Sequence, residues 1–191
     1  MKGVHSVVFI GLISASAAQA EWQEVSEAKN GSFYTNVESA NIEANNLAIY
    51  FDPDSNCDAH ATIFDWYSEL DREGRSHWRN VSGAELQGTM QSKIDRSFSG
   101  ESVAYKDYSY SDEDEFGTIQ YTFELSPEYV IDLEKGAVVK FRFTEDGEHF
   151  EDIIRYPLEG SKLRLTQARN LCEEALNGSW SYDFESDGEV W

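Results

Sequence analysis

The two cysteines, Cys57 and Cys172, constrain the fold of this 191-residue chain more than any other feature, because the sequence contains no others. In an oxidising compartment, a single pair of cysteines most simply forms one disulfide. A redox or nucleophilic thiol would need a C-x-x-C pair, or an unpaired cysteine with a histidine partner, and the sequence shows neither pattern. The sequence therefore predicts a Cys57–Cys172 disulfide. It would close a loop of more than about 100 residues and contribute about 4–5 kcal/mol in the chain-entropy model.

The first 20 residues have the pattern of a secretory signal peptide. Lys2 precedes an apolar run over residues 7–18, and Ala18, Gln19 and Ala20 form an A-x-A cleavage site that looks bacterial. A retained membrane anchor is the alternative, but this run is too short to cross about 30 Å of hydrocarbon as a helix. We therefore expect a signal peptide over residues 1–20 and an exported protein, periplasmic or secreted, with no membrane insertion after cleavage.

Several short runs alternate apolar and polar side chains and end at turn residues, which is the pattern of β-strands. The alternation is clear over residues 47–51, 119–125 and 139–143, and Asp146-Gly147 is a type I′ hairpin turn signal between the last of these and a return strand. The register of the return strand is not defined by its sequence. The predicted fold class is mainly β, a β-rich α+β chain built as an antiparallel β-sandwich or half-barrel.

Two helices are expected among the strands. The first spans residues 126–136, with Ser126 as N-cap and Pro127 at the first helical position. The second spans residues 160–178 and has an apolar stripe on which Cys172 lies. The predicted disulfide would thus tie the C-terminal helix to the sheet. We expect one β-rich domain over residues 21–178, followed by an acidic, aromatic tail over residues 179–191.

The strong acidity of the chain limits its partners. It has 36 Asp and Glu against 15 Lys and Arg, a formal net charge of −21. Phosphate backbones and anionic lipid would repel such a chain, so we expect no nucleic-acid partner and no binding to membrane surfaces. A protein partner, in particular a cationic one, or a divalent cation fits better. The alternative is that the charge only keeps an exported protein soluble. Oligomeric state cannot be inferred from the sequence.

A possible metal site lies in the stretch FDPDSNCDAH. Its acidic and amide side chains alternate as calcium ligands do: Asp52, Asp54, Asn56 and Asp58. However, Cys57 stands where a calcium loop needs glycine for its sharp turn, and Ile63 stands where it needs a bidentate carboxylate. We expect first a turn that leads into the disulfide cysteine, and only second a looser calcium site. No other cofactor is predicted.

No catalytic constellation is visible. His60, His77 and His149 are scattered, and neither an H-E-x-x-H motif nor a G-x-S-x-G motif occurs. The acids allow so many carboxylate pairs that no pair can be singled out, and no catalytic residue is predicted. A set of aromatic residues has two interpretations, a stacking platform for sugars or cations, or cross-strand pairs in the core: Trp66, Tyr67, Trp78, Tyr105, Tyr108 and Tyr110.

The order of elements, with Cys57 between two strands and the late run YPLEGSKLRLTQARNLC, resembles two bacterial families. One is the small exported β-proteins of the invasion-associated locus B type, and the other is an accessory family of type VI secretion. The resemblance covers roughly residues 47–176. It implies a β-sandwich with an appended helix and a non-catalytic role at the cell envelope, and it carries over no active-site residue.

A second resemblance lies in SGESVAY. Periplasmic inhibitors of lysozyme insert a loop with a Ser-Gly pair and a nearby Tyr into the enzyme's cleft. Ser99, Gly100 and Tyr105 are similar in type but more widely spaced, and the resemblance implies that they bind a cationic hydrolase.

Our leading hypothesis is an exported, non-catalytic binding or accessory protein of the bacterial cell envelope. An inhibitor of a cationic hydrolase is the first alternative. A calcium-assisted or carboxylate-based hydrolase of envelope polymers is the second.

Overall fold

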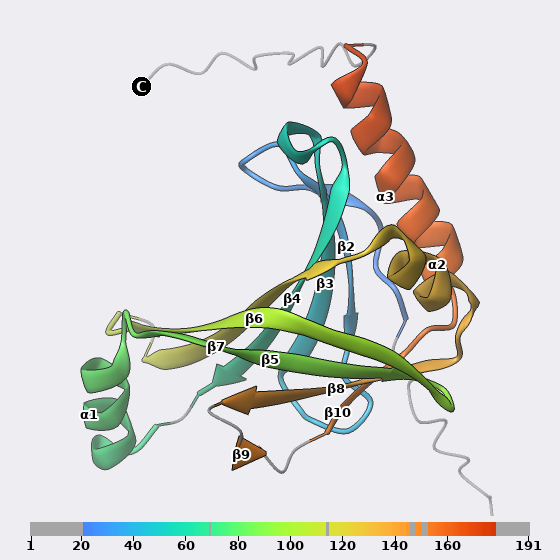
Figure 1. Cartoon of the computed structure of the whole chain (residues 1–191). Helices are drawn as coiled ribbons and strands as arrows, with labels where there is room; N and C mark the ends of the chain where they lie inside the picture. The colour runs from blue at the N-terminus through green and yellow to red at the C-terminus, as the bar shows by residue number, and fades with distance from the viewer. Residues whose placement is uncertain (1–20, 69, 114, 146–147, 150–152, 179–191) are drawn as a thin grey trace, which may run out of the picture.

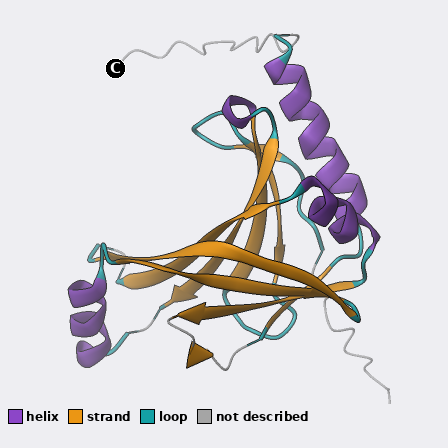
Figure 2. Cartoon of the chain, viewed as in Figure 1, coloured by secondary structure: helices purple, strands orange, loops and turns teal. Residues whose placement is uncertain are grey.

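The structure, a computed structural model, describes residues 21–178 except 69, 114, 146–147 and 150–152. The expected signal peptide and the acidic tail lie outside the described residues. The strands form one antiparallel sheet, and Figure 2 shows it curving strongly, with helices packed at its ends. The ten strands are β1 (Ser26–Glu27), β2 (Phe33–Glu38), β3 (Asn45–Asp52), β4 (Asp58–Tyr67), β5 (Glu85–Ile94), β6 (Ser97–Ser111), β7 (Phe116–Leu125), β8 (Val138–Glu145), β9 (Glu148–His149) and β10 (Ile154–Pro157).

The sheet is a half-barrel. Its strand order is β1-β2-β3-β4-β7-β6-β5-β8-β10, and the short strand β9 pairs with β8 outside this path. Strand β10 at one edge returns to the loop between β2 and β3, where the amide of Ala40 donates a hydrogen bond to the carbonyl of Arg155 at 2.8 Å. Since a single curled sheet encloses the core, the half-barrel prediction is confirmed, and the sandwich implied by the family resemblance is not what forms.

Both predicted helices are present. Helix α2 (Pro127–Lys135) begins where expected, since the Ser126 hydroxyl accepts a hydrogen bond from the amide of Tyr129. Helix α3 (Ser161–Leu176) lies against β2 and β3, and its Leu165, Ala168 and Cys172 are buried there. No described helix combines the length and the apolar character needed to cross a membrane.

A further helix, α1 (Arg72–Val81), was not predicted from the sequence. It is polar on most sides, and Trp78 is its buried residue. Asp71 caps it, because its carboxylate accepts a hydrogen bond from the amide of Gly74 at 2.7 Å. The aspartate cap was the available signal, but a helix with so few apolar side chains lacks the periodic stripe on which the prediction depended.

The predicted disulfide is present between Cys57 and Cys172, whose Cα atoms are 5.9 Å apart. Cys57 follows the 3₁₀ turn η1 (Pro53–Ser55) that joins β3 to β4. The bond therefore ties α3 to this end of the sheet, as expected. An ion pair between Arg169 and Glu134 also joins α3 to α2.

The predicted hairpin after α2 is present, with β8 paired to the return segment. Val139, Phe141 and Phe143 of β8 are buried together, as the alternation indicated. The turn residues Asp146 and Gly147 lie outside the described residues, while Glu145 and Glu148 on either side pair across the strands. In the described part of the return segment, β9 and β10 each pair with β8, and residues 150–152 between them lie outside the described residues.

The sheet has an inner face, turned toward the core, and an outer face. Successive side chains of a strand point to opposite faces. In β6, Ala104 and Lys106 are buried on the inner face, while Val103 and Tyr105 are exposed on the outer face. Helix α3 covers the inner side of β2 and β3, and the described helices leave the outer face of β5, β6 and β7 open (Figure 1).

Candidate functional site

A groove lies on the outer face across β4, β5, β6 and β7, and we call it the outer groove. Its volume is about 780 Å³, within the range of small-molecule sites. The side chains that define it are His60, Gln87, Val103, Tyr105, Thr122 and Glu124.

Strand register brings these residues together from distant parts of the chain. Tyr105 lies between Gln87 of β5 and Thr122 of β7, because it is the Cα partner of both. One row further along, His60 of β4 is the partner of Glu124. Neighbouring strands are about 4.8 Å apart, so these rows form a continuous surface across the sheet.

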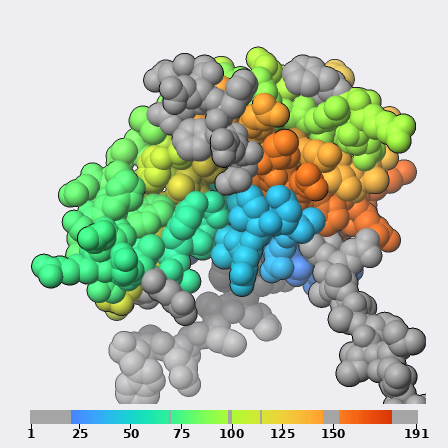
Figure 3. Space-filling view, turned by 90° about the horizontal axis from the view of Figure 1, so that it is seen from below, coloured from blue at the N-terminus to red at the C-terminus, as the bar shows by residue number. Residues whose placement is uncertain are grey.

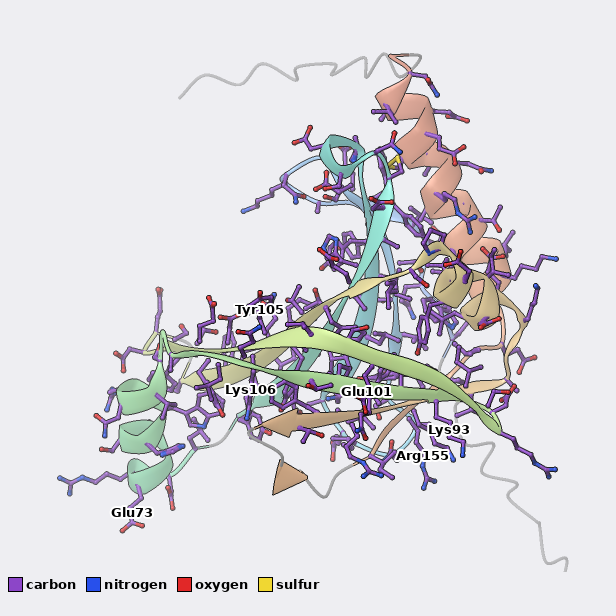
Figure 4. The ribbon with its side chains drawn as sticks, in the orientation of Figure 1. Glu73, Lys93, Glu101, Tyr105, Lys106 and Arg155 are labelled. Carbon is purple, nitrogen blue, oxygen red and sulfur yellow. A yellow bond between two sulfur atoms is a disulfide. The ribbon has the colours of Figure 1, made fainter. Side chains whose placement is uncertain are left out.

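The centre of the outer groove is apolar. Val103 is 55% exposed and Tyr105 is 45% exposed, and they lie two residues apart on the same face of β6. Figure 4 labels Tyr105 on this strand beside Lys106, which the alternation places on the opposite face. A tyrosine and a valine exposed side by side offer contact area of the kind found at the centres of protein interfaces.

The surroundings of this centre are acidic. Glu124 lines the groove, and Glu101 and Asp107 flank Val103 and Tyr105 along β6 on the same face. The carboxylate of Glu101 accepts a hydrogen bond from the side-chain amide of Gln91 at 2.7 Å, which orients it. No Lys or Arg is among the described residues that line the groove. The groove therefore presents an apolar centre within a negative field.

An aromatic row extends the outer groove toward β2. The rings of Tyr34 and Tyr50 stack with centroids 5.0 Å apart, and Tyr50 stacks on His60 at the same separation. Burial in this row lowers the pKa of His60 below its ordinary value, although the carboxylates of Asp52 and Glu124 act in the opposite direction. His60 therefore favours the neutral imidazole, which can both donate and accept a hydrogen bond.

The three residues expected to bind a cationic hydrolase all lie in β6. Ser99 falls at an irregularity where the pairing of β5 with β6 shifts register, and Gly100 beside it has φ of +116°. Tyr105 lies further along the strand, in the outer groove. The three residues thus belong to one strand rather than to a protruding loop, and their role stays a prediction.

The predicted calcium stretch forms a tight turn. The carboxylate of Asp52 accepts a hydrogen bond from the amide of Asp54 at 3.0 Å, and Asn56 and Cys57 both have positive φ. Within the described part of the chain, no group of three or more His, Cys, Asp or Glu is arranged to hold a metal ion. Asp58 pairs with Asp52 at the start of β4. Calcium binding here stays a prediction.

The aromatic residues considered as one platform are dispersed. Trp78 is buried against Tyr67 and Tyr108, and a methyl group at Gly117 would lie 2.3 Å from its indole. Tyr67, on the inner face of β4, lines another hollow, and Trp66, which stacks on Phe64, borders the same hollow at the end of the strand. Of the six, Tyr105 is the one that lines the outer groove.

The sequence patterns did not single out Val103, Gln87 or Glu124 as groove residues. The alternation in SVAYKD could have placed Val103 on the same face as Tyr105. The partners from β5 and β7 could not have been found in this way, because they depend on the order of the strands in the sheet.

Comparison with known proteins gives a structural likeness but no sequence match. No protein-family model matches the sequence, and no curated protein matches it significantly. The chain is similar to the crystal structure of invasion associated protein B from Bartonella henselae, with a TM-score of 0.45 and 11% sequence identity, over 81% of this chain and 98% of that chain. The structural comparison thus returns a protein of the invasion-associated type that the sequence resembles. No functional assignment follows from a likeness of this degree, and the type VI secretion resemblance stays a prediction.

Proposed function

We propose that this chain is an exported binding protein of the bacterial cell envelope, and that it acts by holding a basic protein or peptide in the outer groove rather than by catalysis. One observation supports this most strongly: Tyr105 and Val103 are exposed together in a groove bordered by Glu124, Glu101 and Asp107. The net charge of −21 means that the whole molecule, and not only the groove, would attract a basic partner.

The physical roles of the two parts differ. The apolar centre supplies affinity, because tyrosines buried at the centre of an interface commonly cost about 2 kcal/mol or more when truncated. Exposed ion pairs contribute only about 0.2–1 kcal/mol each. The acidic border therefore acts mainly on the association rate and on the choice of partner, by attracting basic proteins and repelling acidic ones.

The compartment in the proposal is the periplasm or the exterior. The Cys57–Cys172 disulfide is consistent with an extracytoplasmic protein, since disulfides persist in oxidising compartments. The signal-peptide pattern of residues 1–20 supports the same location.

Affinity capture with matched variants tests the proposal. Wild-type protein, Tyr105→Ala and Leu163→Ala would each be immobilised and exposed to periplasmic extract of the source bacterium, and retained proteins identified by mass spectrometry. Leu163 is an exposed leucine on α3, which packs against β2 and β3, and it is not among the residues that line the groove, so it serves as the control. We expect a basic protein to be retained by the wild type and the control but lost from Tyr105→Ala, with retention weakened by added salt.

The same protein retained equally by all three columns would contradict the proposed groove. A retained acidic protein would contradict the proposed partner. For the hydrolase-inhibitor version, titration into a lysozyme turbidity assay is decisive, because undiminished lysis at excess protein would exclude lysozyme as the partner.

A further inference from the structure

Lys106 is a charged side chain in the interior of the half-barrel. It is 2% exposed, although lysines are almost never fully buried unless their charge is compensated. Its ammonium lies 4.8 Å from the centroid of the Tyr108 ring, and the rings of Tyr121 and Phe143 lie at 5.7 and 5.8 Å. Aromatic faces attract a cation through their quadrupoles, so these rings are part of what compensates the charge.

This lysine lines a cavity of about 380 Å³ on the inner face, which we call the barrel-mouth cavity. Met90, Ile119, Phe143 and Ile154 provide much of its apolar wall. Trp66, 39% exposed, borders it at the end of β4. Figure 3 views the molecule from this end, where the loop between β2 and β3 lies beside the end of β4 and the strands β8 and β10.

Two acidic side chains share the cavity with Lys106. The carboxylate of Asp65 accepts a hydrogen bond from the Tyr67 hydroxyl at 2.7 Å. Burial first, and this hydrogen bond second, raise the pKa of Tyr67 far above its ordinary value, so its hydroxyl stays a donor. Glu43, from the loop between β2 and β3, is exposed and also borders the cavity.

We propose that the barrel-mouth cavity binds a small, neutral and flat molecule, with an aromatic or unsaturated ring system and a carbonyl oxygen that accepts a hydrogen bond from Lys106. Aromatic and aliphatic walls favour a flat apolar body, because offset and edge-to-face ring contacts add to area burial. The ammonium of Lys106 is a strong donor to an oxygen acceptor.

A charged ligand of either sign would meet at least one like charge in the cavity. An anionic head group would meet the carboxylates of Asp65 and Glu43 as well as the field of an acidic protein. A cationic head group would meet the ammonium of Lys106 at short range. A neutral acceptor avoids both like-charge contacts and can still accept a hydrogen bond from the ammonium of Lys106.

This site is separate from the outer groove. Tyr105 and Lys106 are consecutive in β6 and lie on opposite faces of the sheet, so a ligand in the cavity does not occupy the groove. The inference therefore stands or falls independently of the proposed protein partner.

A charge series on one ring skeleton tests the proposal with the wild-type protein. Calorimetric titrations would compare 2-acetonaphthone, 2-naphthoate and 2-naphthylmethylammonium, which have similar shape but are neutral, anionic and cationic. We expect the ketone to bind at least about ten-fold more tightly than either ion. Equal binding of all three, or tightest binding of an ion, would overturn the proposal.

Variants then locate the interaction. Lys106→Met keeps the length of the side chain and removes the donor, and it should weaken ketone binding roughly ten-fold, as expected for a hydrogen bond to a charged group. Lys162→Met, at an exposed position of α3, is the control and should bind as the wild type. Unchanged ketone affinity in a folded Lys106→Met protein would overturn the assignment. If Lys106→Met does not fold, Ile119→Trp, which fills the cavity from its wall, should abolish binding, and undiminished binding would overturn it.

Discussion

Tyr105 and Lys106 are neighbours in the sequence and opposites in the structure. Tyr105 is 45% exposed on the outer face, while Lys106 is 2% exposed on the inner face. The usual preferences of a tyrosine and a lysine are thus inverted in this part of β6. Each departure points to one of the two proposed sites. On the outer face, Tyr105 is part of an exposed apolar centre for a partner. On the inner face, Lys106 is a buried charge beside a cavity.

Mutations on the two faces should also have different effects, on stability in one case and on binding in the other. The inner face holds the packed rings and aliphatic side chains, so changes there should lower the free energy of unfolding. The outer face has few buried contacts around Tyr105, so changes there should leave stability nearly unchanged and alter binding.

Removing the disulfide should have the largest effect on stability, and this effect does not depend on either of the two proposed sites. Replacing both Cys57 and Cys172 with serine should lower the free energy of unfolding by about 4–5 kcal/mol, because the bond closes a long loop in the unfolded chain. Urea denaturation measures the change. A loss below about 1 kcal/mol would show that α3 is held mainly by packing, and free thiols in denatured wild-type protein would contradict the bond itself.

A pair of aromatic truncations compares the faces directly. Phe141→Ala removes a ring that is 1% exposed and packs against Phe123 and Tyr156, so it should cost about 3–5 kcal/mol. Tyr105→Ala should stay within about 0.5 kcal/mol of the wild type. Chemical denaturation of both variants is the measurement, and similar losses would contradict the division between the faces.

A methyl group added to the inner face sharpens the comparison. In Gly88→Ala, the new Cβ would lie 2.4 Å from a ring carbon of Phe143 and 2.6 Å from the carbonyl oxygen of Thr144. Overpacking of this kind should cost about 1–3 kcal/mol. Thermal unfolding of the variant is the measurement. Thr89→Ala changes the next residue, which lies on the opposite face, and as the control it should lower the melting midpoint less than Gly88→Ala does. Equal shifts in midpoint would argue against the tight inner packing.

The free energy of unfolding should depend weakly on pH through His60, which lines the outer groove. Burial lowers the pKa of His60 in the folded protein, so the unfolded chain takes up the proton more readily. The stabilising contribution is therefore complete above the unfolded pKa of about 6.5 and is lost as pH falls through the folded pKa. His60→Gln should flatten this part of the stability profile. His77→Gln, exposed on α1, should keep it, and an unchanged profile in His60→Gln would contradict the role.

Calcium should have the smallest effect. The carboxylate of Asp52 already accepts the amide hydrogen bond that caps η1, and we expect calcium in place of chelator to move the melting midpoint by less than about 1 °C. A rise of several degrees would indicate that the folded state binds the ion, since a ligand that binds only the folded state stabilises by mass action. The site over Asp52–Asp58 would then need to be reconsidered.

The sequence predicted the features that local patterns carry. Ser126 and Pro127 predicted the start of α2, alternation predicted the inner side chains of β8, and the cysteine pair predicted the tie between α3 and the sheet. Helix α1 was missed because Asp71 starts a segment without an apolar stripe. The two candidate sites were out of reach for a different reason. They combine β4, β5, β6 and β7 through a strand order, β4-β7-β6-β5, that no local pattern contains.

The most direct test of the two-face account is a two-by-two binding measurement. Tyr105→Ala and Lys106→Met would each be titrated with 2-acetonaphthone and with the basic protein retained from periplasmic extract. The account predicts that Tyr105→Ala loses the protein and keeps the ketone, while Lys106→Met loses the ketone and keeps the protein. Equal weakening of both interactions by either variant, in folded protein, would contradict it.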